Sequence, residues 1–180
     1  MKNSLKRESV SSLLEIINSA CKDSKDPIIV GGSYSRGCSI CGDLDLITSK
    51  YNGKLIIDKL NADITASGDK LCRMEVPIGH DQFQIDIRFS DNLSPKELYF
   101  LTLHEQGNSY FNIVMRSIAK KMNYKLNEYG LYNLDGTEAE FNIFYEASIF
   151  HKLGLKFIPL NERTHDNIVS VYRTINKYKA

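Results

Sequence analysis

The sequence predicts an α+β protein, in which a mixed sheet flanked by helices is followed by a small helical lobe with a short hairpin. Three observations support this fold class. Strand-like alternation of apolar residues dominates before residue 95, helical spacing dominates after it, and no internal repeat or low-complexity linker interrupts the chain. A length of 180 residues suits one domain or two small lobes. We expect a strand-rich lobe over residues 1–100 and a helix-rich lobe over residues 101–180.

The first lobe begins with a predicted helix. Apolar residues recur at helical spacing from Val10 to Cys21, which predicts a helix over 9–22. A second, short helix is expected over 54–61. Four segments are predicted strands: PIIVGG (27–32), DLDLIT (43–48), KLCRMEVPIG (70–79) and FQIDIRF (83–89). In the last of these, apolar residues from Phe83 to Phe89 alternate with Gln84, Asp86 and Arg88, so the two sets lie on opposite faces.

The second lobe is predicted to be mainly helical. The expected helices cover 95–104, 109–122, 138–152 and 166–178. The second of these is the best defined, because Phe111, Val114, Met115, Ile118 and Met122 form one apolar stripe. The stretch YKLNEYGLYN (124–133) predicts a hairpin with a turn.

Bulk composition limits the classes of protein to consider. Apolar residues make up 42% and charged residues 25% of the chain, as in a globular protein in water. No apolar run is long enough to span a membrane, and the polar N-terminus lacks the apolar core of a secretory signal. Four cysteines without such a signal indicate reduced thiols, so we expect an intracellular protein that is not secreted. The net charge of +1 neither supports nor excludes a nucleic-acid partner.

Three aspartates are candidate metal ligands. Asp43 and Asp45 are two residues apart, so on a strand their side chains share one face, roughly 7 Å apart along the chain. Carboxylates this close repel each other unless a cation lies between them, and Mg²⁺ prefers such oxygen ligands. Asp86 lies on the polar face of another strand that could be a neighbour, which would give three carboxylates for two-metal phosphoryl transfer. Each feature alone also fits a solvated strand start or a plain surface charge.

A glycine-serine turn precedes the aspartates. Gly31, Gly32 and Ser33 would let backbone N–H groups approach an anion, and Arg36 would supply a fixed cation for phosphates. The same glycine pair also fits an ordinary turn. No G-x-x-x-x-G-K-[ST] motif is present, so a Walker-type nucleotide site is not indicated.

Three blocks of sequence together resemble a known family. GGSYSRGCSICGDLDLIT (31–48), QIDIRF (84–89) and GNSYFNIVMRSIAKKMNYKLNEYGLYN (107–133) resemble family X nucleotidyltransferases, the group of DNA polymerase beta, and are most like a minimal viral member. The resemblance covers roughly residues 25 to 163. It implies a nucleotidyltransferase palm and a C-terminal lobe that contacts nucleotide and template. Because the first predicted strand begins at residue 27, we expect no amino-terminal lyase domain before the palm. For a viral protein, the expected location is the cytoplasm or nucleus of a host cell, or the virion.

The resemblance also implies an activity. A DNA-directed DNA polymerase would add dNTPs to a primer 3′-hydroxyl with two Mg²⁺ ions, for which Mn²⁺ could substitute. The expected substrate is gapped or nicked DNA in repair, such as base excision repair, and the expected state is a monomer without membrane contact. Two other functions stay open: a nucleotidyltransferase that modifies an RNA end, a protein or a small molecule, and a non-catalytic DNA-binding module.

The resemblance assigns roles to individual residues. Asp43 and Asp45 would ligate both metals, and Asp86 would ligate the catalytic metal and help to deprotonate the 3′-hydroxyl. The β- and γ-phosphates would be held by Gly32, Ser33, Arg36 and Gly42. The sugar and base would be contacted by His104, Gly107 and Asn112. Arg116 would reach the template strand of DNA, and Lys120, one helical turn farther along the same stripe, is a candidate for DNA contact from its spacing alone.

Two features qualify these roles. Asn112, Arg116 and Lys120 are four residues apart and line one polar stripe, which also fits an ordinary solvated helix face. Gln84 stands where relatives often carry a basic residue, which puts the positioning of the primer in doubt.

Arg88 shares the face of Asp86, and we hypothesise that it pairs with an active-site carboxylate when metal is absent.

Overall fold

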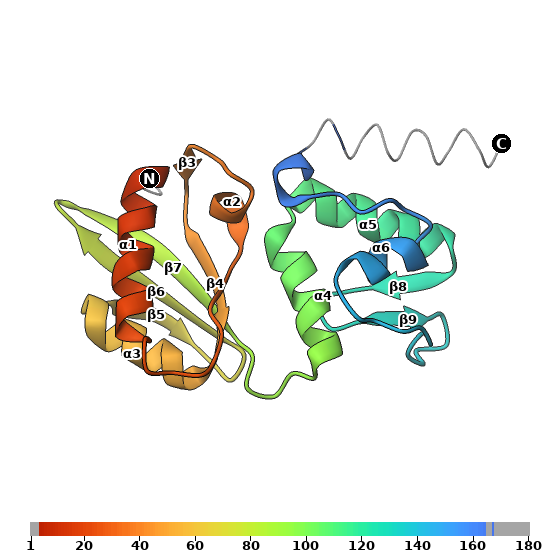
Figure 1. Ribbon diagram of the computed structural model, residues 1–180, viewed down its shortest axis with the longest axis horizontal. Helices are drawn as coiled ribbons and strands as arrows, with labels where there is room; N and C mark the ends of the chain where they lie inside the picture. Colours follow the sequence, from red (N-terminus) through yellow and green to blue (C-terminus); the bar gives the residue numbers. More distant parts are fainter. Residues whose placement is uncertain (1–3, 165–166, 168–180) are drawn as a thin grey trace. The chain divides into compact units, whose positions relative to one another are not determined.

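The chain folds as an α+β protein, as its sequence predicts, and divides into two compact units. The structure is a computed structural model that describes residues 4–164 and 167. The units are residues 1–92 and 93–180 (Figure 1). Each unit has a hydrophobic core of its own. No helix in the described part of the chain is both long and apolar enough to cross a membrane.

A five-stranded mixed sheet forms the first unit, with strand order β2-β4-β7-β6-β5. Its strands are β2 (Ile29–Val30), β4 (Leu44–Thr48), β5 (Asp63–Ser67), β6 (Leu71–Ile78) and β7 (Asp81–Phe89). The central pair β4 and β7 is parallel, and the other neighbouring pairs are antiparallel. The sheet is therefore mixed, and its parallel pair brings together two segments that are about forty residues apart in sequence.

Two helices cover one face of this sheet, α1 (Arg7–Ala20) and α3 (Lys50–Leu60) (Figure 1). Their apolar stripes pack on every second residue of the central strands, such as Leu44 and Leu46 of β4, because strand side chains alternate between faces. The opposite face is polar around Asp45 of β4 and Gln84, Asp86 and Arg88 of β7, with the buried Ile47 farther along β4. A four-residue helix α2 (Gly32–Ser35) follows β2, and the short strands β1 (Leu5–Lys6) and β3 (Ile40–Cys41) pair beside it.

As far as the structure describes it, the second unit consists of helices and one hairpin around a second core. Its helices are α4 (Pro95–Gln106), α5 (Ser109–Lys121), α6 (Ala147–Lys152) and the 3₁₀ turn η1 (Leu160–Glu162), and its hairpin strands are β8 (Tyr124–Leu126) and β9 (Leu131–Asn133). A capping box of Ser94 and Glu97 starts α4, with Pro95 in its first turn. The apolar stripe predicted for α5 is its buried face, with Phe111, Val114, Met115 and Ile118 in the core.

Two predicted helices differ from the structure or fall outside it, and one strand of the five-stranded sheet was not expected. The helix expected over 138–152 is wrong in its first half, because residues 138–139 pair with β9 and only Ala147–Lys152 is helical. The strand β5 was not predicted, because its short alternation of Ile64 and Ala66 with polar residues lies on a segment whose five residues are all exposed. The helix expected over 166–178 lies outside the described residues, apart from residue 167.

Candidate active site

Two of the three candidate metal ligands lie side by side on the polar face of the sheet. Asp45 of β4 and Asp86 of β7 are direct partners in the parallel pair, and neighbouring strands are about 4.8 Å apart. The residues on either side of them, Leu44 and Leu46 in β4 and Ile85 and Ile87 in β7, are fully buried against the helices. The two carboxylates therefore project from the opposite face, next to each other.

Asp43 completes the group at the start of β4. It stands one residue before the strand and two residues before Asp45, and it is half-buried, as Asp45 and Asp86 are. Its charge reaches the same region, because Asp43, Asp45 and Asp86 all raise the pKa of one arginine, Arg73. Three acidic groups from two separate chain segments thus share one electrostatic environment.

Arg73 of β6 is the cation in this environment. It lies directly opposite Asp86 in the antiparallel pair of β6 and β7. Its Nε donates to Asp86 Oδ1 at 2.9 Å and its Nη2 donates to Asp86 Oδ2 at 2.7 Å. Hydrogen bonding to Asp86, followed by the charge of Asp86, raises the pKa of Arg73. Gln84 of β7 also donates to Asp86 Oδ1, at 2.9 Å, so the carboxylate accepts three hydrogen bonds.

Sequence reasoning considered Arg88 as the cation near the carboxylates but did not single out Arg73. A signal for Arg73 was present. A two-residue turn at Gly79 and His80 places Ile78 opposite Asp81, and counting back along both strands places Arg73 opposite Asp86.

The carboxylates of Asp43, Asp45 and Asp86 are suitable ligands for a hard divalent cation, but they do not converge on one point in this structure. Carboxylate oxygens are the donors that Mg²⁺ and Mn²⁺ prefer, and the register of Asp45 and Asp86 brings two of them together. Among the residues that the structure describes, no group of three or more His, Cys, Asp or Glu side chains is close enough to hold a metal ion. Both oxygens of Asp86 are bonded to Arg73, so ligation of a metal by Asp86 requires that pair to open.

The glycine-serine turn lies directly against this group. The Gly31 N–H donates to the Asp45 carbonyl at 2.8 Å, which fixes the turn to β4. Gly32 follows with φ +62°, in the left-handed region, and a Cβ there would overlap the Asp45 carboxylate oxygen Oδ2. The position therefore requires glycine for two reasons, the backbone angle and the close approach of the carboxylate. The turn that is expected to hold phosphates is thus in contact with an expected metal ligand.

Ser33 contributes a polar group without a partner in this turn. Its Oγ is buried and forms no hydrogen bond with any residue that the structure describes. A buried hydroxyl without a partner is unfavourable, and an incoming anion is one group that would satisfy it. Arg36, another predicted phosphate contact, follows at the end of α2 and is half-buried. At Gly42, also predicted to contact phosphate, an added Cβ would have no neighbour within 4 Å, so no close contact requires glycine there.

Helix α1 holds the turn in place through Tyr34. Arg7 Nη1 donates to the Tyr34 carbonyl at 2.7 Å, and its guanidinium lies 4.0 Å from the centre of the Tyr34 ring. The Tyr34 hydroxyl is hydrogen-bonded to Ser11 Oγ at 3.0 Å. These contacts fix the residue that follows Ser33, so α1 acts as a support for the turn. Neither Arg7 nor Ser11 was identified from the sequence.

We predict that Gly32→Ala lowers the efficiency of any reaction at this site by about a hundredfold, because the new methyl group must displace the Asp45 carboxylate. The measurement is kcat/KM for the nucleotide. Gly37→Ala is the matched control: Gly37 also has a positive φ, +85°, but its Cβ would meet nothing within 4 Å. It should show backbone strain in a denaturant titration without the loss in kcat/KM. Equal losses in the two variants would contradict the role given to the contact with Asp45.

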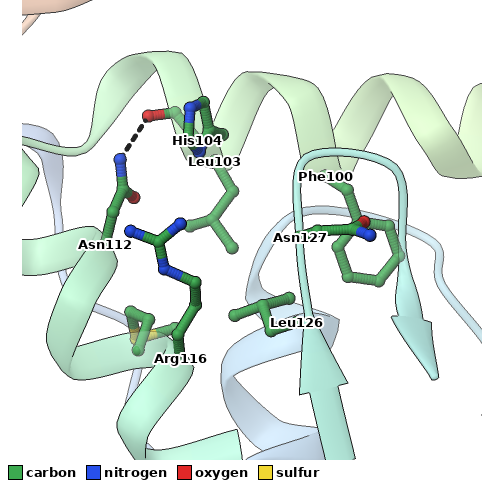
Figure 2. Close-up of a pocket in the computed structure, with 8 residues that line it drawn as sticks. Phe100, Leu103, His104, Asn112, Arg116, Leu126 and Asn127 are labelled. Atoms are coloured by element: carbon green, nitrogen blue, oxygen red, sulfur yellow. Dashed lines mark hydrogen bonds between the residues drawn. The ribbon is translucent and has the colours of Figure 1, made fainter.

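Three of the residues predicted to contact nucleotide or DNA gather around one pocket in the second unit. His104 of α4 and Asn112 and Arg116 of α5 line it, together with Phe100, Leu103, Met115, Leu126 and Asn127 (Figure 2). Asn112 Nδ2 donates to the His104 carbonyl at 2.9 Å, and Arg116 extends from the next turn of α5 on the same side. The pocket is small, about 20 Å³, which is room for about one water molecule. A base would therefore have to lie over these residues rather than inside the pocket.

Gly107 stands at the turn between the two helices that form this pocket. A Cβ there would come within 2.5 Å of Asn112 Oδ1 and 2.6 Å of the Phe111 ring. Glycine at this position therefore lets the Asn112 side chain reach back to α4. Lys120 is exposed one turn beyond Arg116 and does not line the pocket. Leu126 and Asn127, from the end of β8, are pocket residues that sequence reasoning did not identify.

Comparisons with known proteins point to one family. The model of the DNA polymerase beta thumb matches residues 101–164. Similar curated proteins are named Repair DNA polymerase X and come from African swine fever virus, including a tick isolate from Pretoriuskop in South Africa, a warthog isolate from Namibia and the Badajoz strain. Each is 26% identical over 138 residues, covering 72% of this chain and 77% of the viral protein. The resemblance to family X that the sequence blocks predict is thereby confirmed.

Proposed function

We infer, from the sequence similarity of this chain to family X DNA polymerases, that it is a DNA-directed DNA polymerase that acts in DNA repair. We further propose that it adds single dNTPs to a primer 3′-hydroxyl in gapped or nicked DNA, as a monomer. The observation that best supports a catalytic role is the register that sets Asp45 beside Asp86, with the glycine-serine turn packed against Asp45.

In the proposed reaction the primer 3′-oxygen attacks the α-phosphorus of the dNTP and pyrophosphate leaves. Two Mg²⁺ ions bound by the three carboxylates would supply charge neutralisation and lower the pKa of the 3′-hydroxyl. Asp43 and Asp45 would orient the triphosphate through these ions, and Asp86 would accept the proton of the hydroxyl. The backbone of Gly32, the Ser33 hydroxyl and Arg36 would hold the β- and γ-phosphates, so that most of the acceleration comes from positioning and electrostatics.

The second unit supplies the proposed contacts to base, sugar and template. Asn112 is held by the His104 carbonyl and Arg116 is exposed beside it, so both can meet a base pair that lies over the pocket. The net charge of +1 favours short contacts with DNA over tracking along it, because electrostatic attraction to long DNA depends on the number of phosphates neutralised. We therefore expect distributive synthesis on short gaps.

The test is incorporation of one labelled nucleotide into a one-nucleotide gap, with each of the four dNTPs against each template base. We expect extension by one nucleotide with Mg²⁺ or Mn²⁺, directed by the template, and none with a chelator. A chain that leaves the gap unfilled but transfers a nucleotide to an RNA end, a protein or a small molecule would contradict the proposal. Binding of gapped DNA without any transfer would contradict it too.

We predict that Arg116→Ala lowers kcat/KM for templated extension by roughly ten- to a hundredfold, since a hydrogen bond to a charged group is worth about 1.5–3 kcal/mol. The loss should be smaller in the transfer of a nucleotide without a template. Lys156→Ala is the control, because Lys156 is an exposed cation of the same unit that does not line the pocket. Equal activity of Arg116→Ala and Lys156→Ala on a gapped template would show that the stripe on α5 is an ordinary solvated helix face.

A further inference from the structure

Both oxygens of the Asp86 carboxylate are bonded to Arg73, in the geometry that arginine forms with carboxylates. A divalent cation ligated by Asp86 needs at least one of these oxygens. Since a metal ion and a guanidinium are both positively charged, they cannot occupy the same side of one carboxylate together. The two cations therefore compete for Asp86.

The surroundings of Arg73 allow it to leave. Its side chain is 44% exposed, whereas that of Asp86 is 16% exposed, so the arginine approaches the carboxylate from the solvent side. Its partner on the other neighbouring strand is Ala66 of β5, a small exposed residue that follows a break in register. The guanidinium thus has open space on one side and three negative charges on the other.

We propose that Arg73 is a positioning residue for Asp86: it holds the carboxylate in the metal-free protein and releases it when a divalent cation binds. This proposal rests on the proposed function, in which Asp86 is a metal ligand. Without metal, Arg73 neutralises part of the repulsion among Asp43, Asp45 and Asp86 and so stabilises the fold. With metal, that neutralisation passes to the cation, and the cost of breaking the arginine pair reduces the affinity for the ion.

The experiment is titration of the full chain with Mn²⁺, without DNA or nucleotide, followed by the electron paramagnetic resonance signal of free Mn²⁺. Arg73→Gln should bind Mn²⁺ about tenfold more tightly than the unaltered protein, because the competing cation is gone. Arg73→Lys, which keeps the charge but loses the two-point contact, should fall between the two. Lys22→Gln removes one exposed charge outside the sheet and should leave the affinity unchanged.

A double-mutant cycle separates this contact from a general effect of charge. In an Asp86→Asn background, Arg73→Gln should no longer tighten the binding of Mn²⁺. Thermal unfolding adds a second readout. In the absence of metal, Arg73→Gln should melt at a lower temperature than the unaltered protein. Addition of Mn²⁺ should raise the melting temperature of Arg73→Gln by more than it raises that of the unaltered protein. If Arg73→Gln is too unstable to titrate, the intermediate affinity of Arg73→Lys carries the test.

Three outcomes would overturn the proposal: unchanged or weaker binding in Arg73→Gln, the same gain in the Asp86→Asn background, or no binding of Mn²⁺ to either the unaltered protein or Arg73→Gln. The result is separable from that of the gap-filling assay. Tighter Mn²⁺ binding in Arg73→Gln by a chain that fills no gap would support the role of Arg73 and refute the polymerase. Gap filling by a protein in which Arg73→Gln does not change the affinity for Mn²⁺ would support the polymerase and refute the role of Arg73.

Discussion

Asp45→Asn should reduce nucleotide incorporation into a one-nucleotide gap by at least about a thousandfold, because it removes a charge that, in the proposed reaction, stabilises the reacting phosphates. Asparagine keeps the shape of the side chain, so the contact with Gly32 and the pairing of β4 with β7 are retained. The measurement is the rate of a single turnover at saturating dNTP and Mg²⁺. Loss of the chemical step with retained folding is the expected pattern for a metal ligand.

Two controls make this result specific. Asp23→Asn carries the same substitution at an exposed position just after α1 and should keep full activity. Binding of gapped DNA should change little in Asp45→Asn, since the residues expected to contact DNA lie in the second unit. An Asp45→Asn protein that incorporates nucleotides as fast as Asp23→Asn would rule out a catalytic role for the acidic group, and with it the two-metal reaction.

Arg163→Ala should lower the free energy of unfolding by about 3–5 kcal/mol, the usual cost of removing one partner from a buried ion pair. Arg163 is 0% exposed, and its Nη1 and Nη2 donate to the two carboxylate oxygens of Glu146 at 3.0 and 2.6 Å. Its guanidinium also lies 5.3–5.8 Å from the ring centres of Phe111, Phe150 and Phe157. Alanine would leave Glu146 unpaired and open a cavity among the rings.

Urea denaturation measures this loss, and a paired replacement identifies its cause. In Arg163→Met with Glu146→Leu both charges are absent, so much of the stability should return. If Arg163→Ala loses less than about 1 kcal/mol, the pair behaves like an exposed salt bridge and the assignment of Arg163 as a central residue of this core is wrong.

The stability of this pair also bears on the residues that line the pocket. Asn108 caps α5 by accepting from the Phe111 N–H at 2.6 Å, and its Nδ2 donates to the Arg163 carbonyl at 2.9 Å. The segment that carries Arg163 therefore ties down the start of the helix that bears Asn112 and Arg116. Sequence reasoning gave Arg163 no role, because an arginine among loop residues carries no periodic signal of burial.

The elements that could be predicted are those whose side chains show a period. Strand β7 alternates between core and polar face, and α5 shows an apolar stripe at helical spacing, so both were identified close to their actual bounds. Strand β5 is an edge strand whose five residues are all exposed, so its short alternation at Ile64 and Ala66 marks no buried face, and its pairing with β6 defines it. The segment before α6 has helix-forming residues, but the Ala139 N–H donates to the Leu131 carbonyl instead, at 2.8 Å. Tertiary pairing decided both cases.

At the acidic group, too, the sequence predicts the face on which each side chain lies but not how the strands pair. The sequence indicates that Asp45 and Asp86 each lie on a polar strand face, but not that their strands are neighbours or in what register they pair. The need for glycine at position 32 is likewise a property of the assembled site, since the group that a Cβ would strike belongs to β4. The supports from α1 and β6, Arg7 and Arg73, follow from packing and register alone.

The central claim is that Asp43, Asp45 and Asp86 gather around a pair of divalent ions beside a bound triphosphate. Anomalous diffraction from crystals grown with gapped DNA, Mn²⁺ and a non-hydrolysable dNTP tests it most directly. The account predicts two Mn²⁺ peaks, both ligated by Asp43 and Asp45 and one also by Asp86, with the Arg73 guanidinium displaced. Mn²⁺ bound to the triphosphate alone, with Asp86 still paired to Arg73, would contradict it.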